Sequence, residues 1–118
     1  MEWVVKFHES FKTEFDQFDK NVQDDLVSSA LCLKKLGPQL GRPTVDTLKG
    51  SKYDNMKELR FRTMGGVWRV AFAFDPRRQA VLLVAGNKMG LSPMLFYKRL
   101  IKKADQRFSD YLKKSLWN

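Results

Sequence analysis

The sequence predicts an α+β fold in which helices pack on one face of a sheet. Apolar side chains recur every three or four residues along 10–36 and again from residue 93 onward, which is the period of a helix with one buried face. Between these stretches, 56–63, 67–75 and 80–86 are short runs of β-formers separated by turn residues. We therefore expect an N-terminal strand, a helical hairpin or long helix, a three-stranded antiparallel meander and a C-terminal helix. All 118 residues are expected to form a single domain.

The first third of the chain is predicted to be a strand followed by helix. Residues 3–7 are rich in β-formers and end beside His8. Residues 10–36 form either one long helix or a helical hairpin with a break near residues 18–20, where an aspartate could cap a second helix. The Gly-Pro pair at 37–38 ends the helical stretch.

Two of the predicted strands, 56–63 and 67–75, form a hairpin around a Gly-Gly turn at 65–66, because glycine readily adopts the positive φ values of such turns. One face of this hairpin is then apolar and the other basic. A three-residue loop would instead set Phe61 against Arg69, which brings charge into the apolar face, so we reject it. The register sets these residues opposite each other: Met64 and Val67, Phe61 and Val70, Leu59 and Phe72, Arg62 and Arg69, Arg60 and Ala71.

The segments around the hairpin carry loop, turn and cap signals. Residues 41–55 are polar and interrupted by proline and glycine, which predicts a surface loop. The sequence DPRR at 75–78 has the residues of a type I turn. Residues 80–86 are apolar on both sides, so this strand should lie centrally with both faces covered. Ser92-Pro93 is an N-cap followed by a favourable proline position, and opens a helix that should run to about residue 116.

The chain is strongly basic, with 22 Lys and Arg against 13 Asp and Glu and a net charge of +9. Such a charge favours a polyanionic partner, above all nucleic acid. On the sheet face turned away from the helices, Arg69 is predicted to lie beside two alanines whose small side chains leave a hollow. Arg60 and Arg62 point into this hollow, and Lys88 follows the central strand. We interpret the hollow as a cationic site; a plain solvated sheet face is the alternative.

RNA cleavage without a metal needs a base for the 2′-hydroxyl, cations for the charge that builds on phosphorus, and an acid for the leaving 5′-oxygen. Arginine suits the second role because its planar fork holds two phosphate oxygens. Neighbouring cations favour the neutral form of a lysine, so Lys57 and Lys88 are candidate bases. Tyr97, early in the last helix, is a candidate acid or a platform for base stacking, and equally an amphipathic residue at a helix edge.

Several other kinds of site are absent from the sequence. There is no Cys/His set with zinc spacing, no Gly-rich phosphate loop and no carboxylate cluster near the basic strands, so we expect no metal and no cofactor. His8 is the only histidine, which excludes a two-histidine mechanism, and we interpret it as structural. Cys32 is interpreted as a small core residue. Since no signal peptide or membrane-spanning run is seen, we expect a cytoplasmic protein with no membrane partner.

Four segments together resemble the HigB-like, phage-derived branch of the RelE/ParE toxin superfamily, in their order and spacing along nearly the whole chain. They are KELR at 57–60, WRVAF at 68–72, GNKMG at 86–90 and FYKRLIKKAD at 96–105. The resemblance implies a compact sheet-and-helix toxin that enters the ribosomal A site and cuts exposed mRNA as a metal-independent endoribonuclease. It also implies a cognate antitoxin, usually a helix-turn-helix DNA-binding protein encoded beside the toxin.

The resemblance also implies site residues. Carried over by position, the leading catalytic residues are Arg60, Arg69, Lys88 and Tyr97. We expect RNA and phosphate contacts from Lys57, Arg62, Lys49 and Lys52. The loop that usually reads GDKSG in this family is GNKMG here, which replaces an acid and a hydroxyl beside Lys88.

Two other functions stay open at this point. A ParE-like relative shares the fold but poisons DNA gyrase by binding, and a stand-alone nucleic-acid-binding module would not arrest growth. A gyrase poison needs no convergent arginines, so replacing Arg69 should leave its toxicity intact. We expect Arg69 to be needed for cleavage but not for folding, because its side chain should point away from the core. We also expect the antitoxin to bind the basic surface or the last helix in a salt-sensitive manner.

Overall fold

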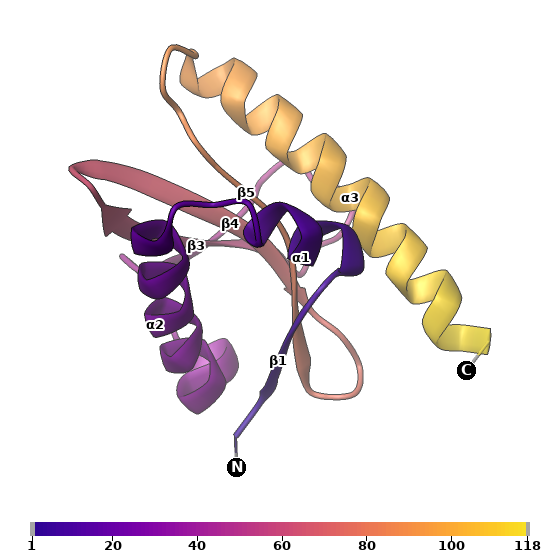
Figure 1. Cartoon of the computed structure of the whole chain (residues 1–118). Coiled ribbons are helices and arrows are strands. Elements are labelled where there is room, and N and C mark those ends of the chain that lie inside the picture. The colour runs from indigo at the N-terminus through magenta and orange to yellow at the C-terminus, as the bar shows by residue number, and fades with distance from the viewer. Residues whose placement is uncertain (1, 118) are drawn as a thin grey trace.

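The computed structural model describes the backbone of residues 2–117 and the side chains of residues 2–115. Within these residues, the strands form one mixed sheet in the order β1-β5-β4-β3-β2 (Figure 1). The strands are β1 (Val4–Phe7), β2 (Val45–Thr47), β3 (Met56–Thr63), β4 (Gly66–Phe74) and β5 (Gln79–Asn87). The helices are α1 (Glu9–Phe15), α2 (Lys20–Leu36), the 3₁₀ turn η1 (Gly37–Gln39) and α3 (Pro93–Trp117). The predicted α+β order of elements is confirmed.

The helices lie on both faces of the sheet, so the expectation that they cover one face is wrong. A first core joins α1 and α2 to one face through Phe11, Leu26, Leu33, Leu59, Val70, Phe72 and Leu82. A second core joins α3 to the other face through Met56, Ala71, Ala73, Val81, Leu83, Phe96, Leu100 and Phe108. β4 and β5 are apolar on both sides and therefore need two covers. The small side chains of Ala71 and Ala73 make room for α3, so this part of the expected hollow is filled.

The helical hairpin is the correct one of the two predicted forms, because α1 and α2 are separate helices. Phe15 and Phe18 lie at the break and pack edge to face with ring centroids 6.2 Å apart. Gln23 Nε2 donates a 2.9 Å hydrogen bond to the Phe15 carbonyl across the break. Gly37 ends α2 with a φ of +54°, and the indole of Trp3 leaves no room there for a Cβ atom.

His8 and Cys32 are the only residues of their types, and the structure gives them different surroundings. His8 is buried and caps α1, with its Nδ1 accepting a 3.1 Å hydrogen bond from the Ser10 amide. This contact fits the structural interpretation of His8. Cys32 is exposed on α2, so its assignment to the core is wrong. The neighbouring Leu33 takes the buried position on that helix.

The β3–β4 hairpin has its turn one residue earlier than predicted. Met64 and Gly65 form the turn, with φ values of 50° and 78°. Because moving the turn by one residue shifts the pairing by two, each side chain keeps its predicted face although every predicted pair is wrong. The observed register stacks Phe61 and Trp68, with ring centroids 6.4 Å apart. The observed pairs are Leu59 and Val70, Arg60 and Arg69, Phe61 and Trp68, Arg62 and Val67, Thr63 and Gly66.

The stretch 41–55 was predicted to be a loop, but it contains the edge strand β2. Val45–Thr47 pairs antiparallel with β3, and Val45 is buried in the first core. Three residues are too few for an alternating pattern to be recognised, which is why the prediction missed this strand.

The last strand and helix agree with the prediction. β5 lies between β4 and β1, and both of its faces are covered. α3 begins at Pro93, and the Ser92 Oγ accepts a 3.2 Å hydrogen bond from the Leu95 amide. Among the described residues, no helix combines the length and the apolar character needed to cross a membrane.

Candidate active site

The four leading catalytic candidates come together on the α3 side of the sheet. Arg60 of β3 and Arg69 of β4 are directly opposite each other in the strand register. The Arg69 guanidinium carbon lies 5.8 Å from the ring centroid of Tyr97, which is in the second turn of α3. The Nζ atom of Lys88, just after β5, lies 5.3 Å from the same ring. Arg69 of β4 and Lys88 after β5 thus lie at the phenol ring of Tyr97, and Arg60 of β3 lies next to Arg69.

A buried carboxylate that the sequence prediction did not include organises this group. The side chain of Glu58 is only 5% exposed and has Arg60 Nη2 at 2.9 Å from its Oε2. Its Oε1 accepts a 2.8 Å hydrogen bond from the Tyr97 hydroxyl and lies 3.6 Å from Arg69 Nε. Strand alternation could have identified Glu58, because it precedes Arg60 by two residues and so shares its face.

These contacts have consequences for protonation. The hydrogen bond from Arg60 to Glu58 raises the pKa of Arg60, which keeps the guanidinium charged. Burial and the hydrogen bond to Glu58 raise the pKa of Tyr97, so at neutral pH this phenol is protonated and donates its proton to Glu58. Tyr97 is therefore held with its hydroxyl turned toward the carboxylate.

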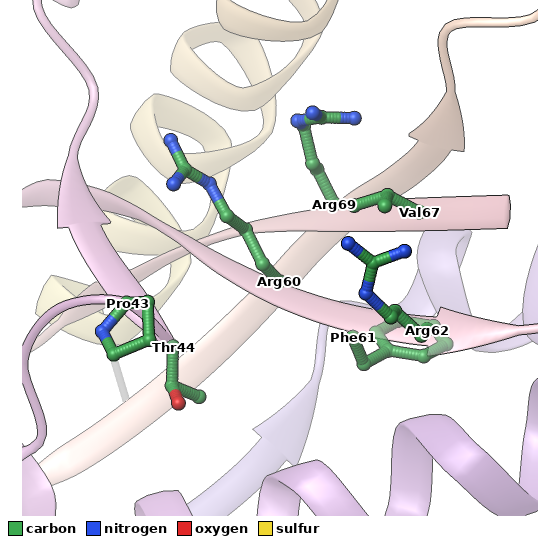
Figure 2. Close-up of a pocket in the computed structure, with 7 residues that line it drawn as sticks. All are labelled: Pro43, Thr44, Arg60, Phe61, Arg62, Val67 and Arg69. Carbon is green, nitrogen blue, oxygen red and sulfur yellow. The ribbon is translucent and has the colours of Figure 1, made fainter.

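Next to this group the sheet carries a pocket of about 430 Å³, which we call the arginine pocket. Figure 2 shows the side chains of Arg60 and Arg62 from β3 and of Arg69 from β4 rising on the same side of the strands. The Nε atoms of Arg60 and Arg69 are buried and have no hydrogen-bond partner among the described residues. Buried donors without partners are unfavourable, so these two Nε atoms add to the cost of packing two arginines here. The pocket is lined by Pro43, Thr44, Arg60, Phe61, Arg62, Val67 and Arg69.

The four residues expected to contact RNA are not all at this pocket. Arg62 lines it and is exposed. Lys57 pairs with Phe72 and therefore lies on the opposite sheet face, where its Nζ donates to Thr47 Oγ1 at 3.2 Å. Lys49 and Lys52 are exposed in the loop between β2 and β3, outside the pocket lining. The fold thus separates residues of like charge that were predicted to act together.

The loop that carries Lys49 and Lys52 is fastened to α3. Asp105 of α3 accepts hydrogen bonds from the Ser51 hydroxyl and from the Lys52 amide, the latter at 3.0 Å. The phenol of Tyr53 is hydrogen-bonded to Ser109, also on α3. These contacts hold the loop and its lysines against the helix that supplies Tyr97.

Arg69 points away from the first core, as predicted, but it packs beside the second core, so we expect it to contribute to folding as well. Its side chain is only 13% exposed, is paired with the buried Glu58, and lies 5.8 Å from the ring centroids of both Phe96 and Tyr97. The reason is the position of α3, which covers the face that was expected to be open. Arg69 therefore links the sheet to the helix as well as lining the pocket.

Comparison with known proteins gives matches in sequence. A family model described as "Phage derived protein Gp49-like" matches residues 13–109. Two curated proteins of Mycobacterium tuberculosis (strain ATCC 25618 / H37Rv) are similar. "Putative toxin HigB2" is 48% identical over 90 residues, which cover 75% of this chain and 44% of that protein. "Putative toxin HigB3" is 46% identical over 87 residues, which cover 73% of this chain and 74% of that protein. The chain thus spans less than half the length of the first relative.

Solved structures match in fold. A mutant of the Escherichia coli toxin RelE in the free state superposes with a TM-score of 0.65 at 13% identity, over 91% of this chain and 98% of RelE. A chain of the archaeal RelE-RelB complex from Pyrococcus horikoshii OT3 superposes with a TM-score of 0.54 at 17% identity, over 76% of this chain and 99% of that chain. At these identities the likeness establishes the fold.

Proposed function

The chain belongs to the family of phage-derived Gp49-like proteins and has the RelE fold, and on that premise we propose that it is a toxin that cuts messenger RNA in the ribosomal A site. The observation that carries the proposal is the convergence of Arg60, Arg69, Lys88 and Tyr97 beside the arginine pocket. The names of the two mycobacterial relatives support the toxin assignment. The fold alone would not, because one fold hosts many functions.

The geometry suits a reaction in which the RNA supplies its own nucleophile. The 2′-oxygen bonds to phosphorus, the bond from phosphorus to the 5′-oxygen breaks, and one proton leaves the 2′-hydroxyl while another reaches the 5′-oxygen. Arg60 and Arg69 hold the phosphate and stabilise the negative charge that builds on its oxygens. Glu58 keeps the two guanidiniums in place, at 2.9 Å from Arg60 and 3.6 Å from Arg69.

Lys88 and Tyr97 are assigned to proton transfer and to contact with the RNA, respectively. Of the two candidate bases, only Lys88 lies on the pocket side, because Lys57 is on the opposite sheet face. We assign both proton transfers to Lys88, whose amine takes the proton of the 2′-hydroxyl and delivers it to the leaving 5′-oxygen. Since the Tyr97 hydroxyl is directed to Glu58, we assign its ring to contact with the RNA, by stacking on a base, and to support of Arg69 and Lys88. Each of these assignments needs the protein's own side chains only.

The test is a cleavage assay on mRNA bound to ribosomes, with mapping of the new 5′ ends. Arg69→Ala should lower the rate of cutting by about 10²- to 10³-fold, the scale for loss of one preorganised donor at a developing charge. Arg69 also contacts α3, so its loss could lower the folded fraction. Thermal melting measures that fraction for each variant, and cleavage rates are then compared per folded molecule. Lys35→Ala, at an exposed lysine on α2, is the control and should cut like the parent.

Two results would reject the proposal. The first is a parent protein that makes no new mRNA ends in the presence of ribosomes. The second is growth arrest with broken DNA and intact mRNA, in both the parent and Arg69→Ala, which is the expectation for a gyrase poison. A protein that binds nucleic acid without arresting growth would fit the stand-alone binding module.

We also propose a cognate antitoxin, of the helix-turn-helix DNA-binding type, that binds through acidic groups. RelE is seen with RelB in the archaeal complex, and this chain has exposed cations at Lys98, Arg99, Lys102 and Lys103 on α3. Charge pairing of this kind accelerates association at low salt. The association rate of the purified pair should therefore fall as salt is raised, and a rate that does not change with salt would contradict this surface.

A further inference from the structure

The arginine pocket has two parts with different chemistry, arranged along the β3–β4 hairpin. In the inner part Arg60 faces Arg69, and Glu58 pairs with both. In the outer part, toward the turn, Arg62 faces Val67. Residues two apart on a strand lie about 7 Å from each other on one face. One nucleotide spans that distance between its phosphate and its base.

The outer part combines an available guanidinium with carbon surface. Arg62 is exposed, and no carboxylate forms an ion pair with it among residues 2–115. Figure 2 shows its side chain rising from β3 toward Val67 and Arg69 of β4. Val67 adds apolar surface to this end of the pocket, whereas Pro43 lies at the other end, beyond Arg60 (Figure 2). A second phosphate has no use for this carbon surface, whereas the face of a nucleobase does.

We propose that this outer part is a base-recognition subsite, in which Arg62 recognises a guanine next to the scissile phosphate. Arginine only donates hydrogen bonds, and guanine offers two adjacent acceptors, O6 and N7, to such a fork. Adenine presents a donor beside N7 and therefore leaves part of the fork without an acceptor. Cytosine also has paired acceptors, but its smaller ring covers less of the carbon surface. This inference rests on the proposed function, and it names Arg62 as the residue that sets sequence preference.

The first test maps cleavage positions for the parent, Arg62→Ala and Arg62→Lys. The parent should show guanine enriched at one fixed position relative to the cut. Both variants should lose this enrichment, because lysine cannot form the bidentate contact, while total cutting falls less than tenfold. Arg77→Ala, at an exposed arginine in the turn between β4 and β5, should keep the parental pattern. If Arg62 only holds phosphate, cutting falls evenly at all sequences and lysine restores it, which would overturn the inference.

The second test does not depend on cleavage. The parent should bind guanosine 3′-monophosphate about tenfold more tightly than adenosine 3′-monophosphate, and Arg62→Ala should bind the two equally. Nuclear magnetic resonance shifts of the Val67 methyl groups would locate the base. A parent that cuts mRNA but binds both nucleotides equally overturns this inference alone. If the parent prefers the guanine nucleotide but never cuts mRNA, the proposed function is overturned, whereas the base-recognition subsite still stands.

Discussion

Two charged clusters lie at opposite ends of α3 and differ in how their charges are balanced. The first is the arginine pocket, where a single buried carboxylate, Glu58, pairs with Arg60 and Arg69 and Arg62 lies beside them. The second, which we call the α1–α3 salt-bridge cluster, consists of His8, Glu9, Glu14, Arg107, Asp110 and Lys114. The first has a surplus of cations and the second does not.

In the α1–α3 salt-bridge cluster each cation has its own acid. Arg107 makes a two-point contact with Glu14, at 2.8 and 2.6 Å, and also donates to the Leu83 carbonyl at 2.7 Å. Lys114 lies 2.7 Å from Glu9 and 3.4 Å from Asp110. Such pairing fastens one helix to another and leaves little charge for a ligand. Unbalanced charge, more than residue type, thus distinguishes the candidate site from a structural link.

The largest effect is expected from Glu58→Ala, which removes the acid that balances the pocket. Arg69 is only 13% exposed and cannot turn fully to water, so we expect a loss of about 3 kcal/mol in the free energy of unfolding, the lower end for a broken buried pair. Cutting should fall at least as much as with Arg69→Ala. Urea unfolding and the ribosome cleavage assay measure the two effects.

Glu2→Ala is the matched control for this change. Glu2 is also a paired glutamate, but it is 60% exposed and lies 3.8 Å from Lys34, so its ion pair is much weaker than those of Glu58. It should be neutral in both assays. If Glu58→Ala is as stable as the parent, the buried arginines do not need a carboxylate for stability. The contrast in charge balance between the two clusters would then have no energetic meaning.

The next largest effect is expected from Arg107→Ala in the other cluster. It removes hydrogen bonds to Glu14 and to the Leu83 carbonyl, which should lower the free energy of unfolding by about 2 kcal/mol. Cutting per folded molecule should stay at the parental rate, because the change lies outside the arginine pocket. Loss of cutting in a folded Arg107→Ala protein would mean that the two clusters are coupled through α3.

A smaller effect is expected from Tyr97→Phe. The variant loses the 2.8 Å hydrogen bond to Glu58 but keeps the ring beside Arg69 and Lys88. The free energy of unfolding should fall by about 1 kcal/mol, and cutting by about tenfold through looser positioning. A loss as large as that of Arg69→Ala would instead make the hydroxyl a proton donor in the reaction.

The smallest effect is a pH dependence that comes from His8. Burial, and then the nearby charge of Arg107, lower the pKa of His8 below its ordinary value of 6.5, although Asp110 and Glu9 oppose the shift. As pH falls below 6.5, the unfolded chain takes up the proton first. This contribution to stability is therefore present above that pH and is lost as pH falls through the folded pKa. Thermal melting between pH 7.5 and 5.5 should show it.

His8→Asn isolates this effect. Asparagine is a good N-cap and can accept the Ser10 amide in place of the Nδ1 atom, but it does not titrate. The fall in melting temperature on acidification should be smaller in the variant than in the parent. An equal fall in both would assign the acid sensitivity to the carboxylates of the cluster.

The sequence predicted those features that depend on periodicity and local signals. The helical period located α2 and α3, the Ser92-Pro93 pair located the start of α3, and alternation assigned the correct face to each residue of β3 and β4. These features are repeated over many residues or fixed by one strong local interaction. They can therefore be recognised from the sequence alone.

The sequence did not predict those features that depend on which elements meet. Either register of the hairpin keeps Phe61 on the apolar face, so the pattern could not choose the turn. Strand β2 is too short to show a pattern. Glu58 shares a face with Arg60, but its importance depends on Tyr97, which lies 39 residues further along the chain. Lys57 was grouped with the arginines by charge, whereas strand alternation placed it on the other face.

The parallel pairing of β1 with β5 has a consequence for the order in which the chain acquires its parts during synthesis. Val4 pairs with Gln79, so β1 leaves the ribosome long before its partner strand exists. Closing so long a loop is slow compared with forming the local β3–β4 hairpin, which brings Arg60 and Arg69 together. Tyr97 emerges after all of them. A nascent chain thus has Arg60 and Arg69 paired early and the ring that supports Arg69 late, which delays the complete group until most of the protein has been made.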